Sequence, residues 1–346
     1  MRGARVALLS ALLAAAAAYA SVPATDGGGL HVPEADRRTP DQTFLTFPEW
    51  FLVFSPAEYA DMLRDGQPAD AFPFLGHVGQ FWRAYARVID ATRGFAFNGE
   101  YHVMILVIGS STTIEYGIKG AYETLVGRLS GLTAAPNATP EDRLATEQAQ
   151  AYVDFIRIEP WYKFDFTTPL KRLWTELPWT GPHLLRKWER RYLLTSEWLV
   201  KAGYAALIRR ATGSTFDAPR PTTLAVMRGL EAGTGGLPGT EVLRRDGAQA
   251  LLSLPRYQPF TDHAVALAKQ GADFDEIAGN RGTILVSLVV PASRAVDADA
   301  PVLIRQPIAT RPGFERRVLQ VEVAQLSALL RARAAAGDPI EHVFDY

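Results

Sequence analysis

The amino-acid sequence predicts an α+β protein: a mainly helical, aromatic-rich part over residues 44–212, followed by a ferredoxin-like antiparallel sheet domain over residues 213–346. In the first part apolar residues recur three to four positions apart, which is the period of a helix with one buried face. In the second part they gather in short runs bounded by turn-forming residues, which is typical of strands. Hydrophobic residues make up 48% of the chain, so both parts have enough apolar side chains for a core.

The N-terminus has the pattern of an export signal. Two arginines precede an apolar run over residues 6–18, and Ala18-Tyr19-Ala20 supplies the small residues that a signal peptidase recognises. We therefore expect residues 1–20 to be a signal peptide, or a short anchor in the inner membrane if they are retained. Residues 21–43 are rich in turn formers and charges, and we expect them to be a flexible tether.

The composition favours an exported bacterial protein of the periplasm and excludes several classes of partner. The chain has 36 Lys+Arg and 37 Asp+Glu, a balance that gives no reason to expect nucleic acid as a partner. There is no cysteine, which excludes disulfides and thiolate chemistry. The six histidines lack the spacing of a helical metal site and no glycine-rich segment has a nucleotide-binding pattern, so neither metal nor cofactor is expected.

Helix signals follow one another through the first part. Ser55 is expected to cap a helix whose first residue is Pro56 and whose capping box is completed by Glu58. The longest apolar segment, residues 101–130, contains charged residues where a membrane span would have to continue, so we expect a buried helix bent near Gly109. Further helices are expected over residues 78–92, 139–158 and 183–210.

The second part alternates strand and helix signals. Apart from one additional short strand signal at residues 302–304, the last hundred residues have the order strand, helix, strand, strand, helix, strand, which is the split βαβ order of ferredoxin-like domains. The strand signals lie at residues 224–227, 250–254, 283–290, 302–304, 317–323 and 340–344, and the helix signals at 261–270 and 324–335. An exposed edge of this sheet, or the terminal strand, could pair with a partner chain.

The expected helix at 183–210 is basic and amphipathic, which is typical of a helix that lies on a membrane surface. Its apolar residues recur on one face, while seven basic residues accompany only two acidic ones. The alternative is that the apolar face packs inside the helical part and the basic residues are solvated. The membrane-surface candidates are Arg186, Lys187, Arg190 and Arg191.

Tryptophans are concentrated in the same region. Residues 159–198 hold five of the seven in the chain, several of them on proline-rich loops. Flat aromatic rings can line a cleft for a glycan or a small hydrophobic molecule, or they can simply pack in a core. The ligand-binding candidates are Trp161, Trp174, Trp179, Trp188 and Trp198.

Catalytic candidates are restricted to a carboxylate–histidine pair for proton transfer. His102 lies beside Glu100 at the start of the apolar helix, and Glu115 and Glu49 are the other carboxylates considered. On an unbroken helix His102 and Glu115 would be about 20 Å apart, so the pair requires a sharp bend near Gly109. The alternative is that these side chains form a polar cluster in which each is hydrogen-bonded and none is catalytic.

Two short segments resemble parts of bacterial exported or envelope-associated proteins. They are Thr46-Phe47-Pro48-Glu49-Trp50-Phe51 and Glu341-His342-Val343-Phe344-Asp345-Tyr346. The resemblance implies an envelope protein of two parts and transfers no catalytic residue.

These features together lead to a functional hypothesis. We expect an exported, non-enzymatic accessory protein of the bacterial envelope that binds a hydrophobic or glycan-like ligand, or a membrane surface, through residues 159–210. The alternative is a periplasmic hydrolase that uses the carboxylate–histidine pair.

Overall fold

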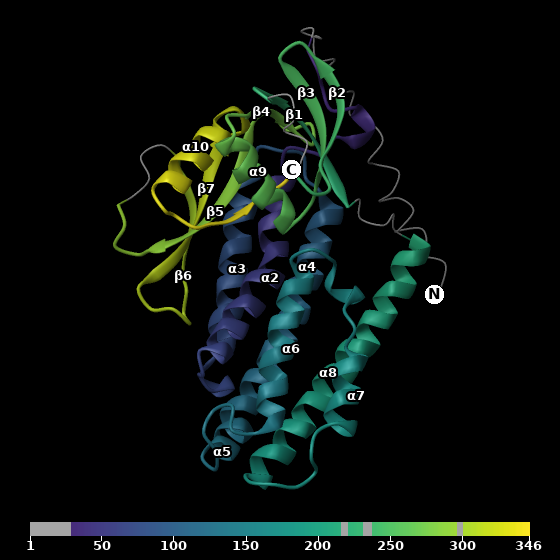
Figure 1. The fold of residues 1–346 in the computed structure, drawn as a ribbon, viewed down its shortest axis with the longest axis vertical. Helices are drawn as coiled ribbons and strands as arrows, with labels where there is room; N and C mark the ends of the chain where they lie inside the picture. The colour runs from purple at the N-terminus through teal and green to yellow at the C-terminus, as the bar shows by residue number, and fades with distance from the viewer. Residues whose placement is uncertain (1–28, 216–220, 231–236, 296–299) are drawn as a thin grey trace, which may run out of the picture.

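A bundle of helices carries two antiparallel sheets at one end in the computed structural model, which describes residues 29–215, 221–230, 237–295 and 300–346 (Figure 1). The structure confirms the α+β class and the order of helices followed by strands. The expected signal peptide, residues 1–20, lies outside the described residues.

The helical part contains more helix than the sequence predicted. The helices expected over 78–92 and 139–158 are present, and the Thr139 hydroxyl accepts from the Asp142 N–H at the start of the second. The short helix α7 and the π-helical segment Glu123–Gly127 were not expected. The helices are α2 (Gln42–Arg64), α3 (Phe74–Ala91), α4 (Gly99–Tyr122), α5 (Arg128–Gly131), α6 (Pro140–Ile156), α7 (Thr167–Thr175) and α8 (Leu184–Thr215).

Helix α2 begins well before the predicted cap, so the prediction of a helix start at Ser55 is wrong. Pro48 and Pro56 both lie inside the helix, where each removes one backbone hydrogen bond. Most side chains of α2 are buried, and their packing outweighs this cost. Ser55 is consequently a buried residue in the middle of a helix.

Helix α4 is continuous through Gly109, and the glycine has a role in packing. A Cβ at this position would overlap the ring of Phe81 and lie 2.9 Å from Trp82 Cη2. Gly109 therefore lets α3 approach α4 closely.

Gly109→Ala is expected to lower the free energy of unfolding by about 1–3 kcal/mol, because the added methyl group forces the Phe81 ring to move. Gly117→Ala, also in α4, is the matched control. Nothing lies within 4 Å of its Cβ position, so we expect it to stabilise the helix by about 0.5–1 kcal/mol. Urea denaturation followed by circular dichroism measures both changes, and equal effects would contradict the close-packing role.

The strands form two sheets, and the ferredoxin-like topology is not confirmed. The sheet orders are β2-β3-β1-β4 and β6-β7-β5-β8. A ferredoxin-like sheet would pair the last strand with the first, but β8 pairs with β5 while β3 belongs to the other sheet. The strands are β1 (Thr222–Arg228), β2 (Glu241–Asp246), β3 (Gln249–Pro255), β4 (Asp273–Ile277), β5 (Thr283–Pro291), β6 (Val302–Pro307), β7 (Phe314–Glu322) and β8 (Ile340–Val343).

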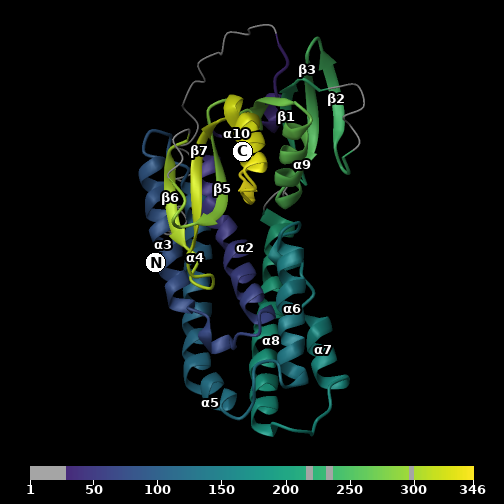
Figure 2. The ribbon, with the colours of Figure 1, turned by 60° about the vertical axis from the view of Figure 1, so that its left-hand side comes forward.

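Helices α9 (Gln258–Lys269) and α10 (Val323–Ala335) pack against each other, and α10 also packs on β4. Figure 2 shows the two sheets at the upper end of the bundle, with β6 and β7 beside the upper part of α3. Side chains of both sheets and of these two helices share one apolar core.

The two segments that carry the sequence resemblance meet where α2 contacts the second sheet. The Trp50 ring stacks on the His342 ring with centroids 3.7 Å apart, and Phe47 lies 5.7 Å from Phe344. Phe344 is fully buried, and the Asp345 carboxylate accepts from Arg256 Nε at 2.9 Å. The C-terminal residues thus join the helical part to the sheets.

Part of the expected flexible tether, residues 21–43, is instead packed on the first sheet. Leu30 and Val32 are buried against Val226 and Leu251. The Val32 N–H donates to Glu276 Oε1 at 3.1 Å, and the segment then continues into α2. Apolar residues between the turn formers provide this anchoring, which composition alone did not indicate.

Candidate functional site

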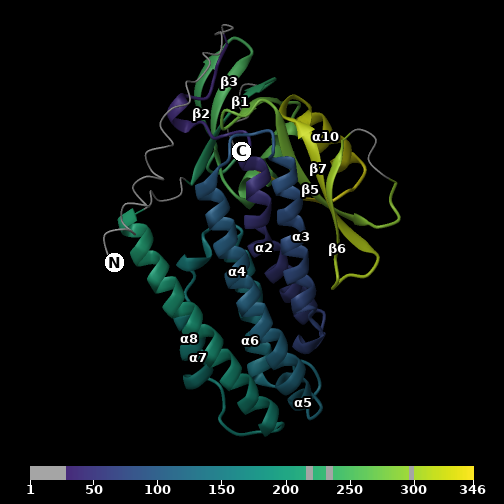
Figure 3. The ribbon, with the colours of Figure 1, turned by 180° about the vertical axis from the view of Figure 1, so that it is seen from behind.

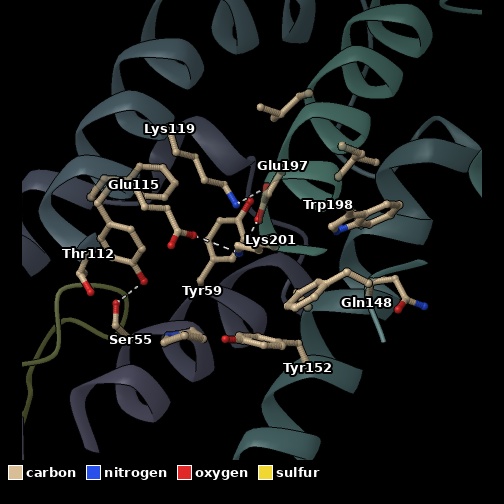
Figure 4. A pocket seen from close by; sticks show the side chains of 18 of the residues that line it. Ser55, Tyr59, Thr112, Glu115, Lys119, Gln148, Tyr152, Glu197, Trp198 and Lys201 are labelled. Atoms are coloured by element: carbon tan, nitrogen blue, oxygen red, sulfur yellow. Dashed lines mark hydrogen bonds and ion pairs between the residues drawn. The ribbon is translucent and has the colours of Figure 1, made fainter. Parts of the chain in front are cut away.

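A cavity of about 120 Å³ lies inside the bundle, bounded by α2, α4, α6 and α8. Figure 3 shows α8 running obliquely beside the other helices, and side chains from α4 and α8 meet in the cavity (Figure 4). Its walls are largely aromatic: Phe51, Tyr59, Phe74, Tyr116, Tyr152, Phe164, Phe166 and Trp198.

Four charged side chains, Glu115 and Lys119 from α4 and Glu197 and Lys201 from α8, cross the cavity as a charge quartet. Lys119 Nζ lies 3.0 Å from Glu197 Oε2 and Lys201 Nζ 2.7 Å from Glu197 Oε1. Lys201 Nζ is also 3.0 Å from Glu115 Oε1. Glu115 is the most exposed of the four, so the quartet reaches the surface there.

Electrostatics keeps the quartet charged. Burial by itself raises the pKa of Glu197, but the two neighbouring lysines hold this pKa below its ordinary value. Burial lowers the pKa of Lys201, while Glu115 and Glu197 raise it to well above the ordinary value. The four groups therefore form a neutral set of paired ions.

The sequence carried a signal for this quartet that the sequence analysis missed. Residues 115–119 read Glu-Tyr-x-x-Lys and residues 197–201 read Glu-Trp-x-x-Lys. A glutamate and a lysine four positions apart lie on the same side of a helix. When two such helices face each other, the motif repeated on both allows ion pairs across the gap.

A hydrogen-bonded chain lies beside the cavity. Ser55 Oγ, which lines the cavity, is 2.9 Å from His77 Nδ1 and 2.7 Å from the Tyr116 hydroxyl. His77 Nε2 is 3.4 Å from Glu58 Oε2 without hydrogen-bond geometry. Burial and the charge of Arg316 lower the pKa of His77 to about 4.

These residue types are those of a serine hydrolase, but their arrangement suits structural support better. A base of such low pKa is weak, and the backbone N–H groups around a mid-helix serine are engaged in the helix, which leaves no oxyanion hole. We therefore interpret Ser55, His77 and Glu58 as a buried polar cluster.

The structure does not bring the four catalytic candidates together. His102 bonds the Tyr85 hydroxyl at 2.8 Å, and burial lowers its pKa. Glu49 accepts from the Tyr101 hydroxyl at 2.7 Å, Glu100 is exposed, and Glu115 belongs to the quartet. Because α4 is unbroken, the predicted carboxylate–histidine pair between His102 and Glu115 is not formed.

The four basic residues expected at a membrane surface are buried, so that assignment is wrong. Arg186, Lys187, Arg190 and Arg191 are exposed by 6%, 1%, 3% and 0%. Their partners are acidic residues of α6 and of the π-helical segment: Lys187 and Arg191 bond Glu141, Arg186 bonds Asp142, and Arg190 forms a bidentate pair with Glu123.

The five candidate tryptophans do not form one cleft. Trp174, Trp179 and Trp188 pack edge to face, and the Arg191 guanidinium lies about 5.5 Å from each ring centroid. Trp161 packs on Tyr204. Of the five tryptophans, the cavity is lined by Trp198 alone.

Two exposed apolar stripes run along α4–α5 and along α8. On α4–α5, positions 103, 107, 114, 118, 125 and 129 alternate steps of four and seven residues, which keeps the first four on one side of α4 over about 22 Å. The last two follow across the π-helical segment. Ile114, Ile118 and Leu129 are 63%, 68% and 65% exposed. The stripe on α8 consists of Leu184, Leu185, Trp188, Tyr192, Leu199, Val200 and Leu207.

Most charges of these helices lie away from the stripes. Between residues 103 and 122 the charged residues are Glu115 and Lys119, and both belong to the quartet. Further along the stripe Glu123 is buried against Arg190, while Arg128 is exposed and lies 3.5 Å from Asp70. All seven charged residues of α8 between positions 184 and 208 are buried or belong to the quartet. Charged groups thus lie inside while large apolar side chains lie outside, the reverse of the usual arrangement of a soluble helix, although α8 also buries Leu194, Trp198 and Ala205.

No family model, curated protein or solved structure matches the chain, so comparison with known proteins gives no information on its function. Within the described ranges no group of His, Asp or Glu side chains could hold a metal ion. No helix in the described part of the chain is long and apolar enough to span a membrane.

Proposed function

We propose that the chain is an exported, non-enzymatic accessory protein of the bacterial envelope that docks on a membrane through the two apolar stripes. The observation that carries the proposal is the inverted polarity of α4 and α8. An exposed apolar surface of this extent marks an interaction site, and burying it contributes about 25 cal/mol per Å².

A membrane fits the stripes better than a protein partner for two reasons. Trp179 in the α7–α8 connection and Trp188 and Tyr192 at the start of α8 are exposed, and such aromatic residues favour the boundary between lipid and water. In addition, the apolar run at residues 6–18 would hold the chain at a membrane if it were retained.

The stripes replace the basic residues as the proposed contact, and this changes the expected salt dependence. Docking through buried charges is excluded by their internal ion pairs. Docking through apolar burial persists at high salt, because screening weakens charge attraction only.

Flotation of the full chain with vesicles of phosphatidylethanolamine and phosphatidylglycerol tests the proposal. We expect Ile114→Gln combined with Leu125→Gln to weaken binding by about 100-fold or more, since fully burying each of these side chains contributes about 1.5–3 kcal/mol. Binding of the unaltered chain is expected to change little between low and high salt.

Leu243→Gln is the matched control, because Leu243 is an exposed leucine on β2, away from the stripes. All variants keep the same N-terminal segment, so a difference between them reports on the stripes. Equal binding of the double variant and the control would refute the proposal. So would a stripe-dependent oligomer that does not bind vesicles, since it would show that a second copy covers the stripes.

A further inference from the structure

The cavity inside the bundle has the features of a ligand site that is separate from the apolar stripes. It lies between four helices, and its polar groups converge from α4, α6 and α8 (Figure 4). Convergent polar groups within apolar walls are typical of small-molecule sites.

The charge quartet restricts the class of ligand. Lys119 and Lys201 are each paired with a carboxylate, and Arg190, which also lines the cavity, is paired with Glu123, so the site has no net charge to offer an ion. Because the quartet is already neutral, an ion that enters the site would itself be a partly buried charge without a counter-ion, which is costly. The quartet therefore disfavours ligands that carry a net charge.

The same side chains keep spare hydrogen-bonding capacity. An ammonium group has three N–H donors and a carboxylate about four acceptor sites. Lys119 donates to Glu197, and Glu115 pairs with Lys201, which leaves further donors and acceptors for a ligand. The Gln148 side chain from α6 also lines the cavity.

The walls supply flat apolar faces. Tyr59 and Tyr152 lie beside the two lysines, and Trp198 closes another side (Figure 4). A ring that carries hydroxyl groups combines apolar faces with many donors and acceptors. We propose that the cavity binds a small uncharged polyhydroxylated ligand, a sugar or a polyol.

Isothermal titration of the full chain without vesicles tests the proposal, with glucose and myo-inositol as uncharged probes. Inorganic phosphate, choline and phosphoethanolamine are the charged or zwitterionic comparisons. We expect saturable binding of at least one uncharged probe and weaker binding of the other three. Failure of both uncharged probes to bind, or equal or tighter binding of a charged or zwitterionic probe, would overturn the proposal.

Two substitutions on α6 locate the binding. Ala149→Leu fills the cavity and is expected to weaken binding at least about tenfold, because the added atoms occupy the ligand's space. Ala151→Leu is the control, since Ala151 is exposed on the same helix. Equal binding by the two variants would place the ligand elsewhere.

A second variant, which changes the packing less, tests the site if Ala149→Leu does not fold. Gln148→Leu removes an amide from the lining and is expected to weaken binding about fivefold, the effect of one neutral hydrogen bond. Unchanged affinity would contradict the proposed site. The result is independent of membrane docking, because no vesicle is present.

Discussion

Glu141→Gln is expected to lower the free energy of unfolding by about 3–5 kcal/mol, the effect of breaking a buried ion pair from one side. The Glu141 side chain is completely buried, and its Oε1 accepts from Lys187 Nζ at 2.8 Å and from Arg191 Nε at 2.7 Å. The substitution preserves the shape of the side chain but removes the negative charge. Two buried cations are then left without their counter-ion, and urea denaturation measures the loss.

Glu147→Gln on the same helix is the control. Its carboxylate pairs with Arg172 at 2.7 Å, but the glutamate side chain is 56% exposed, so the expected loss is below about 1 kcal/mol. If both substitutions cost less than about 1 kcal/mol, the ion pairs beneath α8 are not buried in solution, and the inverted polarity that supports membrane docking disappears with them.

The basic helix shows what periodicity can and cannot establish. The apolar residues expected on one face of this helix are divided, since Trp198 is buried whereas Leu184 and Leu199 are exposed. The sequence predicts the helix itself correctly. It does not reveal which side is inside. The acids that decide this, Glu141 and Asp142, lie in the first turn of α6, where acidic residues are also expected for capping. Their role as counter-ions becomes visible only when α6 and α8 are packed together.

The sheets show a similar limit. Strand β5 is a nearly continuous apolar run and is easily predicted, whereas β2 is mostly exposed and β4 reads Asp-Phe-Asp-Glu-Ile. The sequence analysis did not predict β2 and β4, and the order of the remaining strands and helices resembled that of a ferredoxin-like domain. Pairing partners depend on contacts distant in sequence, so strand order alone did not determine the topology.

The cavity was only partly foreseeable. Trp198 and Glu115 were singled out from the sequence for different reasons, as a ligand platform and as a catalytic carboxylate. The structure places both at one cavity, joined by side chains that no local motif connects. The repeated Glu-aromatic-x-x-Lys pattern was the available signal, but it predicts a contact only for helices known to face each other.

His77 and Glu58 are expected to give the stability of the protein two opposite pH dependences. Burial, followed by the charge of Arg316, lowers the pKa of His77 from 6.5 to about 4. The unfolded state then binds more protons between these values, so this histidine adds about 3 kcal/mol of stability as pH rises from 4 to 6.5. Replacing it removes that gain.

Glu58 acts in the other direction. Burial raises the pKa of Glu58 from 4.5 to about 7, although Arg316, 3.0 Å away, opposes the shift, while Glu341 and Asp61 add to it. The folded state now binds more protons between these values. This glutamate therefore removes about 3 kcal/mol of stability as pH rises from 4.5 to 7.

The two effects nearly cancel in the unaltered protein between pH 4.5 and 6.5, and single substitutions are expected to reveal them. We expect the unfolding free energy of His77→Phe, relative to the unaltered chain, to fall by about 3 kcal/mol from pH 4 to 6.5. That of Glu58→Gln is expected to rise by about 3 kcal/mol from pH 4.5 to 7. Urea titrations at several pH values measure both, and slopes of the same sign would show that His77 and Glu58 are not buried in these ionisation states.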